Sequence, residues 1–371
     1  MSSKPPRVRP HLARLPGYAP VVPLAERARL AGLDPEDCLK LDANENPYGI
    51  HPSVRDTLTT ALADPHFGSI YPDPNQTELR AALARYTGLD SDMIVAGAGA
   101  DELLDLTLRA LLSPGDSIIT CPPSFGMYPF LADVNELKLV EVPRRDGFAL
   151  DAEALLAAID RAAADSVVVL TSPNNPSGDL VPRDLLCEIL ARGATVMLDE
   201  AYIEFAGFES SAQDLLSEYP RLIIMRTFSK WAGIAGLRLG YALAHPDLVA
   251  SLIKIKQPYN INQAAEVAGI AAVDCVDEIA EQIDAIRNTR DQLYDALLGI
   301  EGLSPLPSSA NYILVEVDPG IGTGRQIHDR LAAVGVFTRT YSDPLLTNYL
   351  RISMPQANQL DILLERLSSV L

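Results

Sequence analysis

The stretch SVVVLTSPNNPSGDLVPRDLLCEILARGATVMLD, residues 166–199, contains the pattern that decides the fold. It begins with a short apolar run rich in β-branched residues, continues through an amphipathic segment at 182–191, and ends in a second apolar run at 195–198. Apolar runs of this length predict buried strands, and the amphipathic segment between them predicts a crossover helix. A strand, a helix and a strand in this order indicate two parallel neighbours in an α/β sheet.

The same alternation extends to both sides of this stretch. Another amphipathic segment lies at 151–164, and further apolar runs lie at 117–120, 138–142, 222–225 and, more weakly, 239–242. The fold class is therefore predicted to be α/β, with a large domain whose mostly parallel central sheet is flanked by helices.

The segments before and after this alternation differ from it. We expect residues 1–45 to form an N-terminal arm with one short helical pattern at 24–33. Residues 46–255 should form the large domain, and residues 256–371 a smaller α+β domain. The smaller domain is expected to contain one long helical stretch at 263–298, strands at 312–317, 336–339 and 349–353, and a helix near 325–334.

Composition excludes several classes of protein. The net charge of −19 argues against nucleic acid and anionic membranes as partners, because both bind to basic surfaces. No apolar run approaches the ~20 residues that a membrane-spanning helix needs. The four cysteines lie far apart without a C-x-x-C pair, so we expect reduced thiols, no metal site and a soluble cytoplasmic protein.

Two segments could bind a phosphorylated ligand. VAGAGADE, residues 95–102, places glycines between an apolar run and a helical run, where free N–H groups can receive a phosphate. TSPNNPSG, residues 171–178, follows a strand at the end where α/β sheets bind ligands, and its prolines would hold the Asn175 amide in place. An ordinary strand-to-helix turn and a proline-rich turn explain each segment equally well when it is read alone.

Two further segments carry groups suited to catalysis. TVMLDEAYIEF, residues 195–205, ends a strand on Asp199, a buried carboxylate that needs a cationic partner unless it only caps the next helix. RTFSKWAGIAGLRLGY, residues 226–241, places Lys230 after a buried-looking run, although the chain has only six lysines against 24 arginines. Lysine can form an imine and arginine cannot, and burial readily lowers the pKa of its amine, but Lys230 could also be a surface residue of a loop.

Taken in order, these four segments resemble those of the fold type I enzymes that use pyridoxal 5'-phosphate, specifically the aminotransferases. The resemblance implies that Lys230 carries the cofactor as a Schiff base and moves the proton, with Asp199 on the ring nitrogen and Tyr202 beside the ring oxygen. It also implies a homodimer and small-molecule partners, an amino donor and a keto acceptor. The resemblance assigns the other cofactor contacts to Ala100, Asp101, Phe125, Asn175, Thr227, Ser229, Arg238 and, from the neighbouring subunit, Tyr71.

Closer features resemble the histidinol-phosphate aminotransferase family, among them LDANENPYG at 41–49, YPDPNQ at 71–76, KQPYNIN at 256–262 and YLRISMP at 349–355. The resemblance implies that Arg339 and Arg351 hold the phosphate or carboxylate of the substrate, and that Tyr18 and Tyr259 can line its pocket. The arm LPGYAPVVPL and the Met354-Pro355 pair depart from the pattern of that family. An aromatic amino acid aminotransferase and an amino-acid-phosphate decarboxylase of the same fold therefore remain alternatives.

Overall fold

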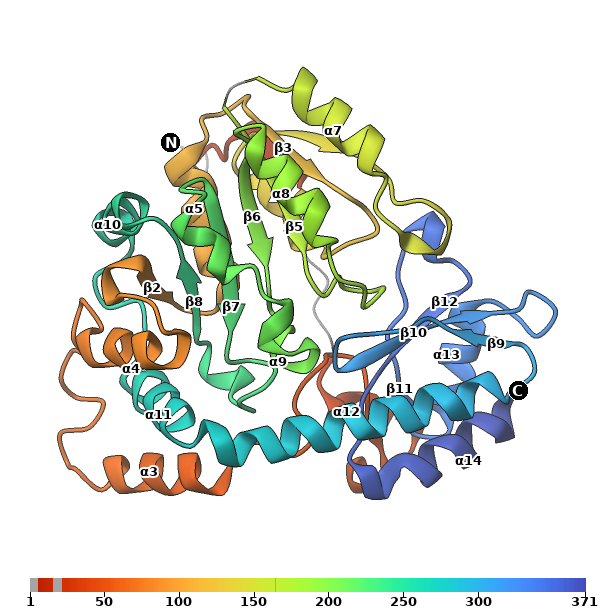
Figure 1. The fold of residues 1–371 in the computed structure, drawn as a ribbon. Helices are drawn as coiled ribbons and strands as arrows, with labels where there is room; N and C mark the ends of the chain where they lie inside the picture. Colours follow the sequence, from red (N-terminus) through yellow and green to blue (C-terminus); the bar gives the residue numbers. More distant parts are fainter. Residues whose placement is uncertain (1–5, 16–21, 164) are drawn as a thin grey trace, which may run out of the picture.

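The computed structural model describes residues 6–15, 22–163 and 165–371. Its largest element is a seven-stranded sheet (Figure 1). In spatial order the strands are β2 (Ile94–Gly97), β8 (Gly240–Leu243), β7 (Leu222–Thr227), β6 (Thr195–Asp199), β5 (Ser166–Thr171), β3 (Ser117–Thr120) and β4 (Lys138–Glu141). The five strands from β7 to β4 are parallel, whereas β8 runs antiparallel to both of its neighbours. The predicted mostly parallel sheet is confirmed.

Both faces of the central strands are buried, which explains why their sequences are continuously apolar. Along β5, Val168 packs into one hydrophobic cluster and Val167 and Val169 into another on the opposite face. The second cluster also contains residues of α5 (Ala100–Leu111), α6 (Met127–Val134) and α10 (Pro246–Ile255). The first contains residues of α3 (Pro52–Leu62), α4 (Thr77–Thr87), α7 (Ala152–Arg161), α8 (Arg183–Ala191), α9 (Ile203–Ala206) and α11 (Gln263–Asp274).

The C-terminal third forms a smaller sheet beside the large one. Strand β10 (Tyr312–Val317) lies between β9 (Leu303–Pro305) and β12 (Tyr349–Ser353), antiparallel to both. Helices α12 (Val276–Leu298), α13 (Gly324–Ala333) and α14 (Leu360–Val370) lie around it (Figure 1). Strand β1 (Leu39–Lys40), near the N-terminus, pairs in parallel with β11 (Val336–Phe337), so the early chain is attached to the C-terminal part.

The remaining short elements lie in the arm and the connections. Helices α1 (Pro10–Arg14) and α2 (Leu24–Ala31) belong to the early chain. Short 3-10 helices are found at Pro35–Asp37, Ser91–Met93, Asp146–Phe148, Phe208–Ser210, Gln213–Ser217, Ala235–Leu237, Pro344–Leu346 and Ala357–Gln359.

The single long helix expected at 263–298 was wrong, because the chain forms two helices there. Helix α11 ends at Asp274 and α12 begins at Val276, and Cys275 between them has non-helical angles of φ −113° and ψ 30°. The residues around the break, VDCVD at 273–277, are weak helix formers, whereas the stretches beyond them on both sides favour helix. Cys275 is buried at the bend.

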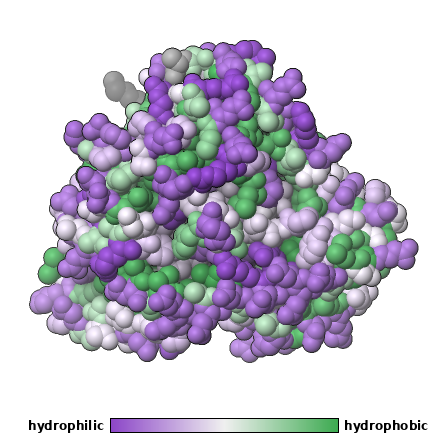
Figure 2. Space-filling view, in the orientation of Figure 1, coloured by the Kyte–Doolittle hydropathy of each residue, from purple (hydrophilic) through white to green (hydrophobic). Residues whose placement is uncertain are grey.

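Hydrophilic residues cover much of the face seen in Figure 2, with apolar patches scattered among them. Among the described residues, no helix combines the length and apolar character required to cross a membrane.

Candidate active site

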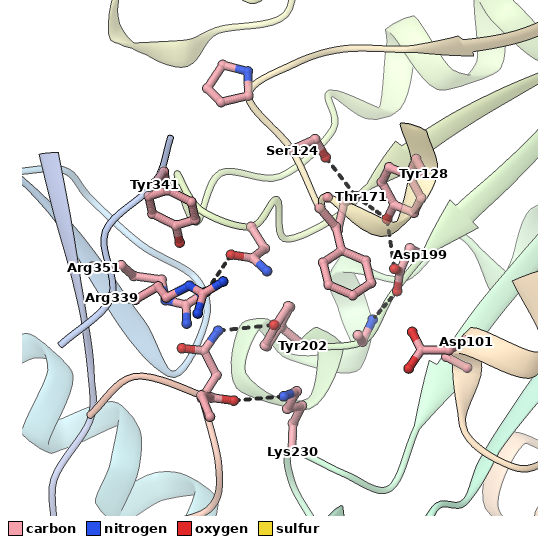
Figure 3. A pocket seen from close by; sticks show the side chains of 18 of the residues that line it. Asp101, Ser124, Tyr128, Thr171, Asp199, Tyr202, Lys230, Arg339, Tyr341 and Arg351 are labelled. Atoms are coloured by element: carbon pink, nitrogen blue, oxygen red, sulfur yellow. Dashed lines mark hydrogen bonds between the residues drawn. The ribbon is translucent and has the colours of Figure 1, made fainter. Parts of the chain in front are cut away.

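The cavity that gathers the predicted residues lies where three parallel strands end. Thr171, Asp199 and Thr227 are the last residues of β5, β6 and β7, and all three line a cavity of about 860 Å³. Open α/β sheets bind ligands at this edge because the strand ends and following loops converge there. The opposite wall comes from the C-terminal part, which contributes Arg339 and Arg351 (Figure 3).

Most of the residues named from the sequence meet in this cavity. Those that line it are Ala100, Asp101, Phe125, Asn175, Asp199, Tyr202, Thr227, Ser229, Lys230, Arg238, Arg339 and Arg351. Tyr71 and Tyr259 do not line it; they stack on each other with ring centroids 4.4 Å apart and are 77% and 47% exposed. Tyr18 lies outside the described residues.

Lys230 is placed as a reactive amine and not as a surface lysine. Its Nζ donates a hydrogen bond to the carbonyl oxygen of Ala43 at 3.0 Å. Burial, reinforced by the nearby positive charge of Arg351, lowers the pKa of Lys230 to about 8. About a tenth of the amine is therefore neutral at pH 7, far more than for a lysine of ordinary pKa, and the neutral amine is the form that attacks a carbonyl carbon.

Asp199 is a buried hydrogen-bond acceptor facing the same space. Its Oδ2 accepts from the hydroxyl of Tyr128 at 2.8 Å and its Oδ1 from the backbone N–H of Ala201 at 3.0 Å. Burial raises the pKa of Asp199 to about 6, and these two hydrogen bonds oppose that rise. A cation placed beside this carboxylate would offset the cost of burying it, so the site fits a protonated heterocycle.

A cup of hydrogen-bond donors suited to a phosphate lies at the start of α5. Gly99 has φ +86°, and a Cβ there would come within 2.4 Å of the Arg238 guanidinium. A Cβ at Gly240 would likewise lie 2.5 Å from the backbone nitrogen of Ala100. The guanidinium of Arg238 contacts Asp101 at 3.1 Å and Ser229 at 3.4 Å. Only glycine permits this close approach of backbone, helix N-terminus and guanidinium, an arrangement that binds phosphate elsewhere.

Tyr202 and Asn175, in the loops that follow β6 and β5, both line the cavity. Tyr202 accepts a hydrogen bond from the side-chain amide of Asn44 at 3.1 Å, and burial raises the pKa of Tyr202 to about 12. Asn175 accepts from the guanidinium of Arg351 at 2.6 Å through its carbonyl oxygen. Any hydrogen bond that Asn175 donates to a ligand therefore comes from its Nδ2 group.

The two arginines of the opposite wall are brought together by strand pairing. Arg339 and Arg351 form an antiparallel bridge, with backbone N–H···O distances of 3.0 and 2.8 Å in the two directions. Residues paired in this way project their side chains to the same face. Arg351 is only 5% exposed, and its Nε lacks a partner among the described residues. Two neighbouring guanidinium groups repel each other unless an anion lies between them, so this wall favours a carboxylate or phosphate.

Sequence reasoning assigned no role to four polar residues that complete the cavity. Asn44 holds the Tyr202 hydroxyl, while Tyr128, Thr171 and Ser124 form a chain of hydroxyl groups that begins at Asp199 (Figure 3). The available signal was that Tyr128 follows Phe125 by three residues; Tyr128 lies in the first turn of α6, and its backbone N–H donates to the carbonyl oxygen of Phe125 at 3.2 Å. Thr171 is the last residue of β5, whereas the sequence alone shows it only as the first residue of the turn TSPNNPSG.

The fold, the buried lysine and the donor-lined cavity define the class, that of the amino-group transferases. The family model described as "Aminotransferase class I and II" matches residues 36–367. The chain is 44% identical over 365 residues to a histidinol-phosphate aminotransferase of Roseiflexus castenholzii, covering 98% of each chain. It is 42% identical over 358 residues to histidinol-phosphate aminotransferase 1, chloroplastic, of Arabidopsis thaliana, covering 96% of this chain and 84% of the relative.

A solved structure gives the same result. The histidinol-phosphate aminotransferase of Sinorhizobium meliloti, in complex with pyridoxal-5'-phosphate, superimposes with a TM-score of 0.88 at 29% identity and 100% coverage of both chains. The chain belongs to the histidinol-phosphate aminotransferase family of class I and II aminotransferases.

Proposed function

We propose that this protein transfers an amino group between L-glutamate and imidazole-acetol phosphate, giving 2-oxoglutarate and L-histidinol phosphate, with pyridoxal 5'-phosphate as cofactor. The observation that carries the proposal is one cavity with the Lys230 amine and the Asp199 carboxylate on one side and a pair of arginines on the other. The names of the relatives support the substrate pair.

The residues of the cavity fit this cofactor. Arg238, Thr227, Ser229 and the N-terminus of α5 would hold its phosphate, and Asp199 would accept a hydrogen bond from its protonated ring nitrogen. Asn175 and Tyr202 would contact the ring oxygen, Phe125 would lie against the ring, and Lys230 would hold the aldehyde carbon.

When bound, pyridoxal phosphate supplies an aldehyde that condenses with amines and a ring that withdraws electrons from the neighbouring carbon. Lys230 supplies the base: its Nζ, whose pKa is lowered to about 8 mainly by burial, takes the proton from the substrate carbon in its neutral form and later returns it. The carbonyl oxygen of Ala43 orients this amine through the 3.0 Å hydrogen bond.

The arginine pair would select the substrates. A guanidinium binds a carboxylate or a phosphate with two parallel hydrogen bonds, so one wall can accept both glutamate and a phosphate monoester. Arg351 is held by Asn175 and by the carbonyl oxygen of Asp42 at 2.6 and 2.7 Å, which fixes the direction of its guanidinium.

A half-reaction tests the proposal directly. The protein loaded with pyridoxal phosphate is mixed with L-histidinol phosphate in the absence of a keto acid, and its absorbance is followed. We expect loss of the cofactor's visible band and formation of one equivalent of pyridoxamine phosphate. No conversion with histidinol phosphate, together with conversion by phenylalanine, would favour the aromatic aminotransferase. Release of carbon dioxide from a phosphorylated amino acid, supplied in place of histidinol phosphate and without a keto acid, would favour the decarboxylase.

The exposed tyrosine pair supports a homodimer. Tyr71 is 77% exposed and does not line the cavity of its own chain, which suits a side chain that reaches the cavity of a second copy. We propose that Tyr71 contacts the cofactor phosphate there. Mixing inactive Lys230→Ala and Tyr71→Ala subunits should restore about a quarter of wild-type activity, because half of the random dimers contain one intact site. A monomeric mass with full activity, or no recovery from subunits shown to exchange, would refute this arrangement.

A further inference from the structure

The hydroxyl groups behind Asp199 form a continuous chain that is buried except at the partly exposed Ser124. The Tyr128 hydroxyl lies 2.8 Å from Asp199 Oδ2 and 2.6 Å from the Thr171 hydroxyl. The Thr171 hydroxyl lies 3.2 Å from that of Ser124, which donates to the side-chain amide oxygen Oδ1 of Asn174 at 2.9 Å. Tyr128, Thr171 and Asn174 are at most 2% exposed, so water does not compete for these groups.

The chain has two complete proton arrangements, because each hydroxyl has one proton to donate. When Asp199 is ionised, Tyr128 donates to it and Thr171 donates to Tyr128. When Asp199 is protonated, each donation reverses: Asp199 donates to Tyr128, Tyr128 to Thr171 and Thr171 to Ser124. Ser124 can donate to the side-chain oxygen of Asn174 in both arrangements, so no hydroxyl lacks a partner in either. The first arrangement gains more, because its Tyr128 hydrogen bond is made to a charged acceptor.

The surrounding charges do not by themselves hold Asp199 ionised. The other titratable groups that act on it include Asp101, which opposes ionisation, Lys230, which favours it, and the nearby Tyr202. Burial is the largest influence and favours the neutral acid. Tyr128 supplies the one side-chain hydrogen bond to the carboxylate among the described residues, so it is the main local group that favours the ionised form.

We propose that Tyr128, oriented by the Thr171 and Ser124 hydroxyls, is a positioning residue that holds Asp199 as an ionised acceptor for the ring nitrogen of the cofactor. Tyr128 acts through Asp199, and its ring also packs edge-on against Phe125 with centroids 5.7 Å apart. The substitution Tyr128→Phe keeps that packing and removes only the oxygen. This inference rests on the proposed function, because it assumes that pyridoxal phosphate occupies the cavity.

Binding of two ligands, one with the ring nitrogen and one without it, distinguishes this positioning role of Tyr128 from a purely structural role. Apoprotein is titrated with pyridoxal phosphate and with its analogue in which a CH group replaces the ring nitrogen, and both dissociation constants are measured. We expect Tyr128→Phe to weaken binding of the natural cofactor by about tenfold to a hundredfold, as is usual for loss of a hydrogen bond to a charged group. Binding of the analogue should change less than about twofold, because it offers no N–H⁺ group to the carboxylate.

Further variants test the chain beyond Tyr128. Thr171→Val keeps the shape of the side chain and the tyrosine, and should give a smaller loss, about threefold to tenfold, again confined to the natural cofactor. Thr107→Val is the matched control, because Thr107 is a buried threonine of α5 that takes no part in this chain. It should leave both dissociation constants unchanged.

The outcomes are distinguishable. Equal weakening of both ligands by Tyr128→Phe would show a packing defect and overturn the inference, as would unchanged binding of the natural cofactor. If the wild-type apoprotein binds neither ligand, the proposed function itself fails. A shift of the pH at which the bound cofactor changes its spectrum, in Tyr128→Phe but not in Thr107→Val, would support the positioning role independently of turnover.

Discussion

The two walls of the cavity are built in different ways. The cofactor wall uses strand ends and the loops directly after them, so Asp199 and Thr227 owe their positions to the strands that they terminate. The arginine wall depends on the register between two chain segments, in which Arg339 pairs with Arg351. Local sequence therefore determines most of the first wall, whereas the second forms only when the C-terminal part has folded. Substitutions in the two walls should separate cofactor binding from substrate recognition.

Loss of the amine in the cofactor wall should have the largest effect. We expect Lys230→Ala to lower transamination by about 10⁴-fold or more, because it removes both the attachment point and the base. The visible absorbance of the lysine-bound cofactor should also disappear. The exposed Lys254 on α10 provides the control, and Lys254→Ala should behave as the wild type in both measurements. Near-normal turnover of Lys230→Ala would contradict the assignment.

Substitution in the arginine wall should impair substrate recognition much more than cofactor binding. We expect Arg351→Ala to lower kcat/KM for glutamate by about a hundredfold, because a charge-assisted bidentate contact is lost. The affinity of the apoprotein for pyridoxal phosphate should change less, by about tenfold at most, since the cup around Arg238 is untouched and only the Asn175 amide loses its Arg351 partner. Arg85→Ala, at an exposed arginine paired with Asp274, is the control. A parallel loss of cofactor affinity in Arg351→Ala would mean that the walls are not independent.

Arg339 sharpens the comparison within the arginine wall. If Arg339 binds the phosphate of histidinol phosphate, Arg339→Ala should lower kcat/KM for that substrate by about tenfold to fiftyfold. The same variant should leave kcat/KM nearly unchanged for phenylalaninol, an amine without an anionic group. Steady-state rates with both amines and 2-oxoglutarate measure this ratio. Equal losses with both amines would show that Arg339 supports the wall without recognising the substrate.

The smallest effect concerns the pH dependence of the cofactor wall. Burial lowers the pKa of Lys230 from 10.5 to about 8. The reactive neutral fraction therefore rises about tenfold per pH unit below that value and levels off above it. Stopped-flow capture of pyridoxal phosphate by apoprotein should follow this curve between pH 6 and about 10. A rate that continues to climb at pH 10 would show that the amine is not desolvated.

Sequence patterns predicted much of the large sheet. The apolar runs at 117–120 and 166–171 coincide with β3 and β5, because strands buried on both faces are apolar at every position. The same patterns did not show that β8 runs antiparallel, since burial is equal in either direction. They also did not show the bend at Cys275, which lies between two helix-favouring stretches.

By itself the sequence determined most strands of the large sheet, the order of the motifs, and the lysine, aspartate and glycine residues whose chemistry depends on their type. Only the tertiary structure decided that Tyr128 and Thr171 support Asp199 and that Arg339 lies beside Arg351. The physical reason is that the first group of features follows from local apolar patterning and side-chain chemistry. Contacts between distant segments depend on strand register and helix packing, which no short stretch of sequence specifies.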